Sequence, residues 1–72
     1  MWHSNVKISG VWANDQDRNA FIYLVGVGWR KLKADTDSAF LAMLTQCLAA
    51  KTGNRPVNAN ENGGLITKVY VF

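Results

Sequence analysis

Residues 34–53, ADTDSAFLAMLTQCLAAKTG, decide the fold, because the spacing of apolar residues changes there from the period of a strand to that of a helix. The apolar residues recur at intervals of three and four, as they do on one side of a helix. The face that we expect to cover a sheet consists of Phe40, Leu41, Leu44, Cys47 and Leu48. Met43 is expected on the flank of that face.

Both ends of this helix carry recognisable signals. Asp35 or Thr36 can accept hydrogen bonds from the free amides of the first turn, and Asp37 suits the positive end of the helix dipole. Lys51 suits the last turn, and Gly53 is a typical C-terminal cap. The pattern therefore predicts a single helix bounded by these residues.

Three strands are expected before the helix, and a turn of polar residues, Asn14–Asn19, separates the first two. Alternation and β-branched or aromatic residues place the strands at Val6–Trp12, Ala20–Val25 and Trp29–Lys33. Gly26 and Gly28 indicate a bulge, a tight bend or a close backbone approach before the third strand. The second strand is apolar on both faces, so we expect both faces to be covered.

Two strands are expected after the helix. Arg55–Ala59 forms the fourth, Asn60–Gly64 is a strong turn signal, and Leu65–Phe72 forms the fifth. The resulting order is strand, strand, strand, helix, strand, strand, which is the order of an OB-fold. The fold predicted for residues 1–72 is a single α+β domain. It is a small five-stranded antiparallel OB-like barrel or bent sheet, with one α-helix between the third and fourth strands.

The composition indicates that some apolar residues lie on the surface and contact a partner, because the core of so short a chain is small. The chain has 72 residues, of which 49% are apolar and 18% are charged, and its net charge is +3. So small a domain cannot hide all of that apolar surface, so we expect a homo-oligomer. The longest nearly apolar run, Ala20–Trp29, is too short to span a bilayer. The chain is expected in the cytoplasm if Met1 is its native start, and outside the cell if a leader has been removed.

The chemistry of an enzyme is not expected here. The only cysteine, Cys47, belongs to the apolar helix pattern, and the only histidine, His3, lies on a terminus expected to be mobile. One histidine and one cysteine do not make a zinc site, and no cofactor motif is present. The aspartate pair Asp15/Asp17 lies in a turn, and the pair Asp35/Asp37 lies at a helix start. Carboxylates at such places accept hydrogen bonds from backbone amides.

Carbohydrate binding is the function expected first. A sugar needs an aromatic face for its apolar side and amides or carboxylates for its hydroxyls. The turn after the first strand offers this combination in one short segment. The predicted glycan site consists of Trp12, Asn14, Asp15, Asp17, Arg18 and Asn19.

Single-stranded nucleic acid is the alternative ligand, because aromatic and basic residues on the strands of an OB-fold can stack bases and hold phosphates. The surface predicted for it consists of Tyr23, Trp29, Arg30, Lys31 and Lys33. A structural or accessory subunit without a small ligand is a third possibility that the sequence leaves open.

The second half of the chain resembles the B subunits of bacterial AB-type toxins, especially the subtilase-cytotoxin and pertussis-like group. The matching segments are Phe40–Leu44, Ala49–Gly53, Arg55–Val57, Gly64–Ile66 and Val69–Val71. The resemblance implies a ring, most often a pentamer, that binds cell-surface glycans and can carry a second, A-type chain. This chain departs from the group in having no cysteine pair for a disulfide, and no sugar-binding residue of the group can be transferred to it.

Overall fold

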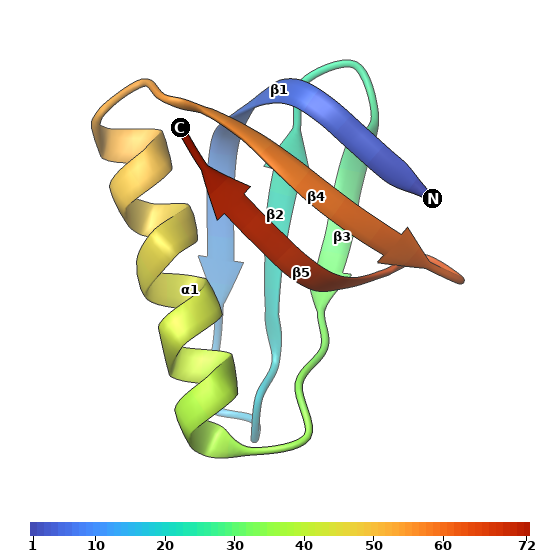
Figure 1. Cartoon of the computed structure of the whole chain (residues 1–72). Helices are drawn as coiled ribbons and strands as arrows, with labels where there is room; N and C mark the ends of the chain where they lie inside the picture. The colour runs from blue at the N-terminus through green and yellow to red at the C-terminus, as the bar shows by residue number, and fades with distance from the viewer.

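The computed structural model describes residues 1–72 as a closed five-stranded barrel with one helix (Figure 1). The elements are β1 Trp2–Ala13, β2 Ala20–Leu24, β3 Gly28–Leu32, α1 Asp37–Thr52, β4 Pro56–Asn62 and β5 Leu65–Val71. The strand order around the barrel is β1-β2-β3-β5-β4. This confirms the predicted OB-like barrel with its helix between the third and fourth strands. The pairing of β3 with β5 is parallel, and the other four pairings are antiparallel.

Strand β1 closes the barrel because it pairs with a different neighbour along each half. Its first half, from Trp2 to Lys7, pairs with β4, and its second half, from Ile8 to Ala13, pairs with β2. The pairing register shifts between Ile8 and Gly10, which is a bulge that lets the strand bend from one neighbour to the other. The expectation that His3 lies on a mobile terminus is therefore wrong, since His3 pairs with Ala59.

The core of the barrel contains only apolar side chains. Its thirteen residues are Ile8, Ala20, Ile22, Leu24, Leu32, Phe40, Met43, Cys47, Ala50, Val57, Ala59, Ile66 and Val69. Helix α1 lies along one side of the barrel and supplies four of them (Figure 1). Alternate residues of the strands supply most of the others, so each strand has one face inside the barrel.

The buried face of α1 is rotated from the one predicted. Phe40 and Cys47 are buried as expected, but Leu41 and Leu48 are exposed and Met43 is buried. The helix is apolar on most sides, so the spacing of its leucines does not single out one face. The helix ends are confirmed, because Thr36 Oγ1 accepts from the Ala39 amide at 3.1 Å.

Strand β2 is covered on one face only. Ile22 and Leu24 are fully buried, whereas Tyr23 and Val25 are exposed on the other side. The expected covering is therefore present within the chain for the inner face of β2, and the chain by itself leaves the outer face open. The bend predicted at Gly26 and Gly28 is confirmed, because both glycines have positive φ: Gly26, at 84°, lies in the turn after β2, and Gly28, at 112°, begins β3.

Candidate functional site

The outward face of strands β1, β2 and β3 gathers four aromatic side chains. Trp12 pairs in register with Phe21, and Tyr23 pairs in register with Trp29. Because paired residues point to the same face of a sheet, these side chains form two neighbouring rows on the outside of the barrel. Trp12 and Trp29 are 46% and 49% exposed, which leaves about half of each residue in contact with water.

The rings on this face meet edge to face and leave a hollow between them. The ring centroids of Trp12 and Phe21 lie 5.5 Å apart with the planes at 67°, and those of Tyr23 and Trp29 lie 5.4 Å apart at 79°. Trp12, Phe21 and Trp29 are the sole lining of a hollow of about 450 Å³. This aromatic hollow is a shallow depression on the surface, and its lining is almost entirely apolar.

The turn that follows Trp12 is held together by its own amide side chains. Asn14 Oδ1 accepts from the Gln16 backbone amide at 3.0 Å and from Asn19 Nδ2 at 3.1 Å. Asn19 Nδ2 also donates to Gln16 Oε1 at 3.0 Å. The predicted site residues Asn14 and Asn19 therefore shape the turn through these bonds.

Arg18 fastens the same turn to the start of α1. Its Nε donates to Asp37 Oδ1 at 2.7 Å, and its Nη1 donates to the Asp35 carbonyl at 3.2 Å. The hydrogen bond to Asp37 raises the pKa of the Arg18 guanidinium above its ordinary value. Asp15 and Asp17 are exposed and form no hydrogen bond or ion pair within the chain. Their carboxylates are the acceptors of this turn that remain free for a ligand.

The surface predicted for nucleic acid is divided between two sides of the barrel. Lys31 pairs with Phe21, so it shares the outward face with Tyr23 and Trp29. Arg30 pairs with the buried Ile22 and therefore points to the inner side of the sheet, away from Tyr23 and Trp29. Lys33 is exposed, and its Nζ lies 3.5 Å from Asp35 Oδ1.

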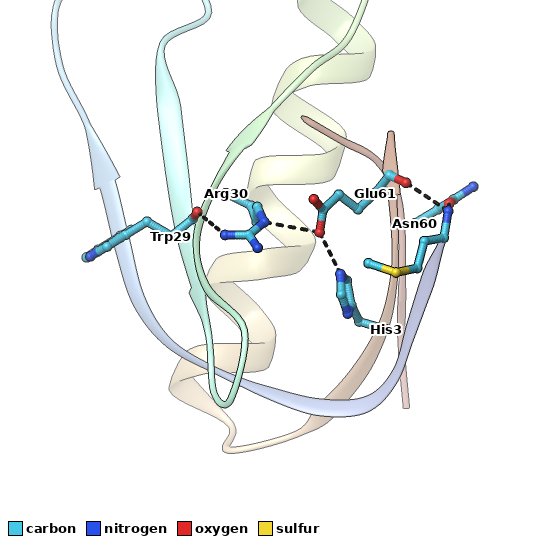
Figure 2. A network of polar contacts seen from close by, with 6 residues as sticks. His3, Trp29, Arg30, Asn60 and Glu61 are labelled. Carbon is cyan, nitrogen blue, oxygen red and sulfur yellow. Dashed lines mark hydrogen bonds and ion pairs between the residues drawn. The ribbon is translucent and has the colours of Figure 1, made fainter. Parts of the chain in front are cut away.

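Arg30 belongs instead to a polar network that joins β1, β3 and β4 (Figure 2). Glu61 Oε1 lies 2.6 Å from His3 Nε2 and 3.0 Å from Arg30 Nε. Because an ionised carboxylate only accepts, the imidazole Nε2 carries the proton of the shorter contact. Arg30 Nη1 also donates to the Trp29 carbonyl at 2.8 Å.

Electrostatics of this network favour an ionised Glu61. The hydrogen bond from His3, and then the neighbouring Arg30, lower the pKa of Glu61 below its ordinary value of 4.5 against the opposing effect of burial. Arg30 Nε is buried, and its contact with Glu61 is an ion pair without the alignment of a hydrogen bond. No local pattern in the sequence predicts the network, because His3 and Glu61 are 58 positions apart.

A larger hollow, of about 750 Å³, lies between α1 and β5. Its walls mix small helix residues such as Ala39 and Ala42 with Val69 and two lysines, Lys33 and Lys68. Size alone favours this hollow as a binding site. We place the candidate site at the smaller aromatic hollow, because three aromatic rings form its entire lining and unpaired carboxylates lie in the adjoining turn.

Cys47 and the acidic residues show no arrangement typical of catalysis. Cys47 is fully buried, and burial raises the pKa of its thiol to about 12. A thiol held in this state is neither a nucleophile nor a metal ligand near neutral pH. No group of three or more histidine, cysteine, aspartate or glutamate residues is placed to hold a metal ion.

Comparison with known proteins adds no relative. The chain matches none of the protein-family models and none of the curated proteins against which it was compared. Helix α1 lacks the length and apolar character of a membrane-crossing helix, and it is the only α-helix of the chain.

Proposed function

We propose that this chain is a non-enzymatic carbohydrate-binding module whose ligand occupies the aromatic hollow of Trp12, Phe21 and Trp29. The observation that carries the proposal is a hollow lined only by aromatic rings beside a turn whose carboxylates are unpaired. A pyranose has one apolar face, which packs on aromatic rings, and an edge of hydroxyl groups, which need hydrogen-bond partners.

The structure supports a site composed differently from the one that the sequence predicts. Trp12 provides a wall, and Asp15 and Asp17 offer acceptors to sugar hydroxyls. Asn14, Arg18 and Asn19 support the turn, as their contacts within the chain indicate. Phe21 and Trp29 join the site because their side chains complete the hollow.

The distribution of charge favours a sugar over single-stranded nucleic acid. Strong binding of a phosphate backbone needs several cations along one groove. On β1–β3, Lys31 and the exposed Lys7 are the cations without an ion-pair partner, because Lys33 contacts Asp35 and Arg30 points to the inner side of the sheet, where it contacts Glu61. Stacking surfaces are plentiful here, but the positive charge that would hold a nucleic-acid strand is scarce.

The test begins with a glycan array probed with the fluorescently labelled chain, and an oligonucleotide titration runs in parallel. The best glycan is then titrated in soluble, monovalent form against Trp12→Ala, Trp29→Ala and Trp2→Ala. We expect a loss of affinity of about tenfold or more for the first two, since each removes one wall of the hollow. Trp2 is similarly exposed but lies outside the hollow, so Trp2→Ala is the matched control.

Two results would contradict the proposal. One is an array on which no glycan is retained above background. The other is equal loss of affinity in Trp2→Ala and Trp12→Ala, which would place the ligand elsewhere. Salt-sensitive binding of oligonucleotides, without glycan binding, would favour the nucleic-acid alternative.

We also propose that the chain assembles with copies of itself into a ring. Ten large apolar residues are at least 36% exposed, and several of them lie outside the aromatic hollow. Trp2 and Tyr70 stack with centroids 5.6 Å apart on one side of the barrel, while Leu41 and Leu48 are exposed on α1. A ring needs two different surfaces that contact head to tail, and these two apolar patches supply such a pair.

Native mass in solution tests the assembly. We expect a closed ring, with five copies favoured by the resemblance to toxin B subunits, and a smaller mass for Trp2→Ala or Leu48→Glu. Trp12→Ala is the control that should keep the ring, because Trp12 lies in the hollow rather than in either patch. A strict monomer at high micromolar concentration would refute the ring and leave the glycan proposal to its own test.

A further inference from the structure

Gly10 lies beneath the Trp29 side chain, although the two residues are on different strands. A Cβ atom built on Gly10 would lie 3.1 Å from Trp29 Cη2 and 3.3 Å from Tyr23 Cβ. Gly10 pairs with Tyr23, and Tyr23 pairs with Trp29, so the indole reaches across β2 to the backbone of β1. The six-membered ring of Trp29 therefore occupies the space that a side chain at position 10 would fill.

Space, rather than backbone conformation, favours glycine at this position. The four glycines with positive φ are Gly26, Gly28, Gly63 and Gly64, and Gly10 is not among them. The pairing register of β1 shifts between Ile8 and Gly10, so the closest approach of the indole falls beside a bulge. Bulges next to binding sites commonly redirect a side chain, and a glycine in a strand often marks a close approach.

We propose that Gly10 is a positioning residue, which sets the orientation of the Trp29 indole and thereby the shape of the aromatic hollow. The inference rests on the proposed carbohydrate function for its meaning, but the contact between Gly10 and Trp29 does not depend on a ligand. Trp29 is one of the three walls of the hollow, so a tilt of its ring changes the surface offered to a sugar.

Gly10→Ala is the variant that tests this role with least damage to the barrel. A methyl group at 3.1 Å from Cη2 forces the indole to move, because that distance is shorter than ordinary carbon–carbon contact. Alanine itself suits a strand better than glycine, and the change lies on the outward face, away from the core. Far-UV circular dichroism and protection of Cys47 from thiol reagents report whether the barrel remains folded.

The first measurement uses no ligand. In a Trp2→Phe/Trp12→Phe background, Trp29 is the only tryptophan, so its emission and its quenching by acrylamide report on this one side chain. We expect Gly10→Ala to shift the emission to longer wavelength and to raise the quenching constant about twofold, since Trp29 is already half exposed. Unchanged emission and unchanged quenching would overturn the proposal.

The second measurement is a double-mutant cycle with the glycan selected on the array. It compares the wild type with Gly10→Ala, Trp29→Phe and the double variant. Phenylalanine lacks the indole atoms that reach Gly10, so we expect Gly10→Ala to weaken binding about tenfold beside Trp29 and hardly at all beside phenylalanine. Equal weakening in both backgrounds would show that Gly10 does not act through Trp29.

The two measurements separate failure of this inference from failure of the proposed function. If the array retains no glycan but Gly10→Ala alters Trp29 emission, the positioning of the indole stands and the carbohydrate function falls. If glycan binds at the hollow but the emission and the cycle show no coupling, the function stands and the role of Gly10 falls. A role of Gly10 in stability alone would lower binding equally in both backgrounds of the cycle.

Discussion

The two faces of strand β2 are equally apolar in sequence but differ completely in environment. Ala20, Ile22 and Leu24 point inward and have no exposed surface. Phe21 and Tyr23 point outward, where Tyr23 is 36% exposed and Phe21 lines the aromatic hollow. The inward residues are aliphatic and fill the barrel, whereas the outward residues are aromatic and meet other aromatic rings edge to face.

This difference shows what an apolar pattern leaves undecided. Alternation identifies a strand, but it does not say whether its second face is covered by the same chain, by another copy or by a ligand. In a barrel of five strands and one helix, the interior takes one face of each strand and no layer remains for the other. An outward face that is rich in aromatic residues is therefore available for contacts outside the chain.

Substitutions on the two faces of β2 should give the largest difference in stability. Ile22→Ala removes a fully buried side chain and should lower the free energy of unfolding by about 4 kcal/mol. Tyr23→Ala should cost about 1–2 kcal/mol, since it removes an edge-to-face contact and partly exposed area. Chemical denaturation followed by circular dichroism measures both values.

The same experiment can break the comparison. If Tyr23→Ala costs as much as Ile22→Ala, the outward face is buried in solution, which would mean that copies of the chain cover it. Repeating the measurement at lower protein concentration separates that case, because stability gained by assembly falls on dilution. A cost independent of concentration would contradict the division between the two faces.

Local signals were sufficient to predict most of the fold. The caps at Thr36 and Gly53 and the turn glycines are confirmed, because each depends on a few neighbouring residues. The sequence does not predict the start of β1 at Trp2, since Trp2 and His3 are held by Asn60 and Ala59 of β4, more than fifty positions away. The buried face of α1 was misplaced at Leu41 and Leu48 because an almost uniformly apolar helix has no unique face.

The candidate site was predicted only in part, and for a related reason. Trp12, Asp15 and Asp17 are candidates that their own segment suggests, but Phe21 joins the candidate site through register with Trp12 across the hairpin. Arg30 lies on the opposite side of the sheet from Tyr23 and Trp29, since its side is set by pairing with Ile22. The pairing register between β1 and β2 would have identified these neighbours. The bulge between Ile8 and Gly10 shifts that register, and the sequence does not reveal the shift.

Charged groups also differ between the interior and the surface of the barrel. Substitution of Glu61 should give the next largest loss of stability. Glu61→Gln weakens the contacts with His3 and Arg30, both of which are largely shielded from water. We expect a clear drop in stability near neutral pH, smaller than that of Ile22→Ala. Thermal unfolding followed by circular dichroism measures it.

At acidic pH, the difference in stability between Glu61→Gln and the wild type should disappear. The folded state lowers the pKa of Glu61 below 4.5, so its contribution is present above that value and is lost as pH falls through the folded pKa. The two unfolding curves should therefore converge as the pH falls below 4.5. A gap that persists in acid would mean that glutamine disturbs packing rather than charge.

Cys47 is an interior group for which the effect should be smaller still. Its thiol is fully buried with a pKa raised to about 12, so it should resist alkylation in the folded chain and react at once in denaturant. Cys47→Ala should cost about 1 kcal/mol and Cys47→Ser about 1–3 kcal/mol, because a buried hydroxyl without a partner is unfavourable. Fast labelling of the native protein would contradict this burial.

The ion pair between Arg18 and Asp37 should give the smallest effect, because it lies on the exterior. Asp37 Oδ1 accepts from Arg18 Nε at 2.7 Å, but the Asp37 side chain is 75% exposed and water screens the pair. Asp37→Asn keeps an acceptor at the first turn of α1 and should leave the melting temperature unchanged within error. Any small difference in melting temperature that low ionic strength reveals should vanish in added salt, because salt screens charges on the surface. A melting temperature that falls as far as that of Glu61→Gln would show that the turn is fastened to α1 as firmly as the barrel is closed by Glu61. The unpaired carboxylates of Asp15 and Asp17 would then be carried by a fixed support rather than by a flexible turn.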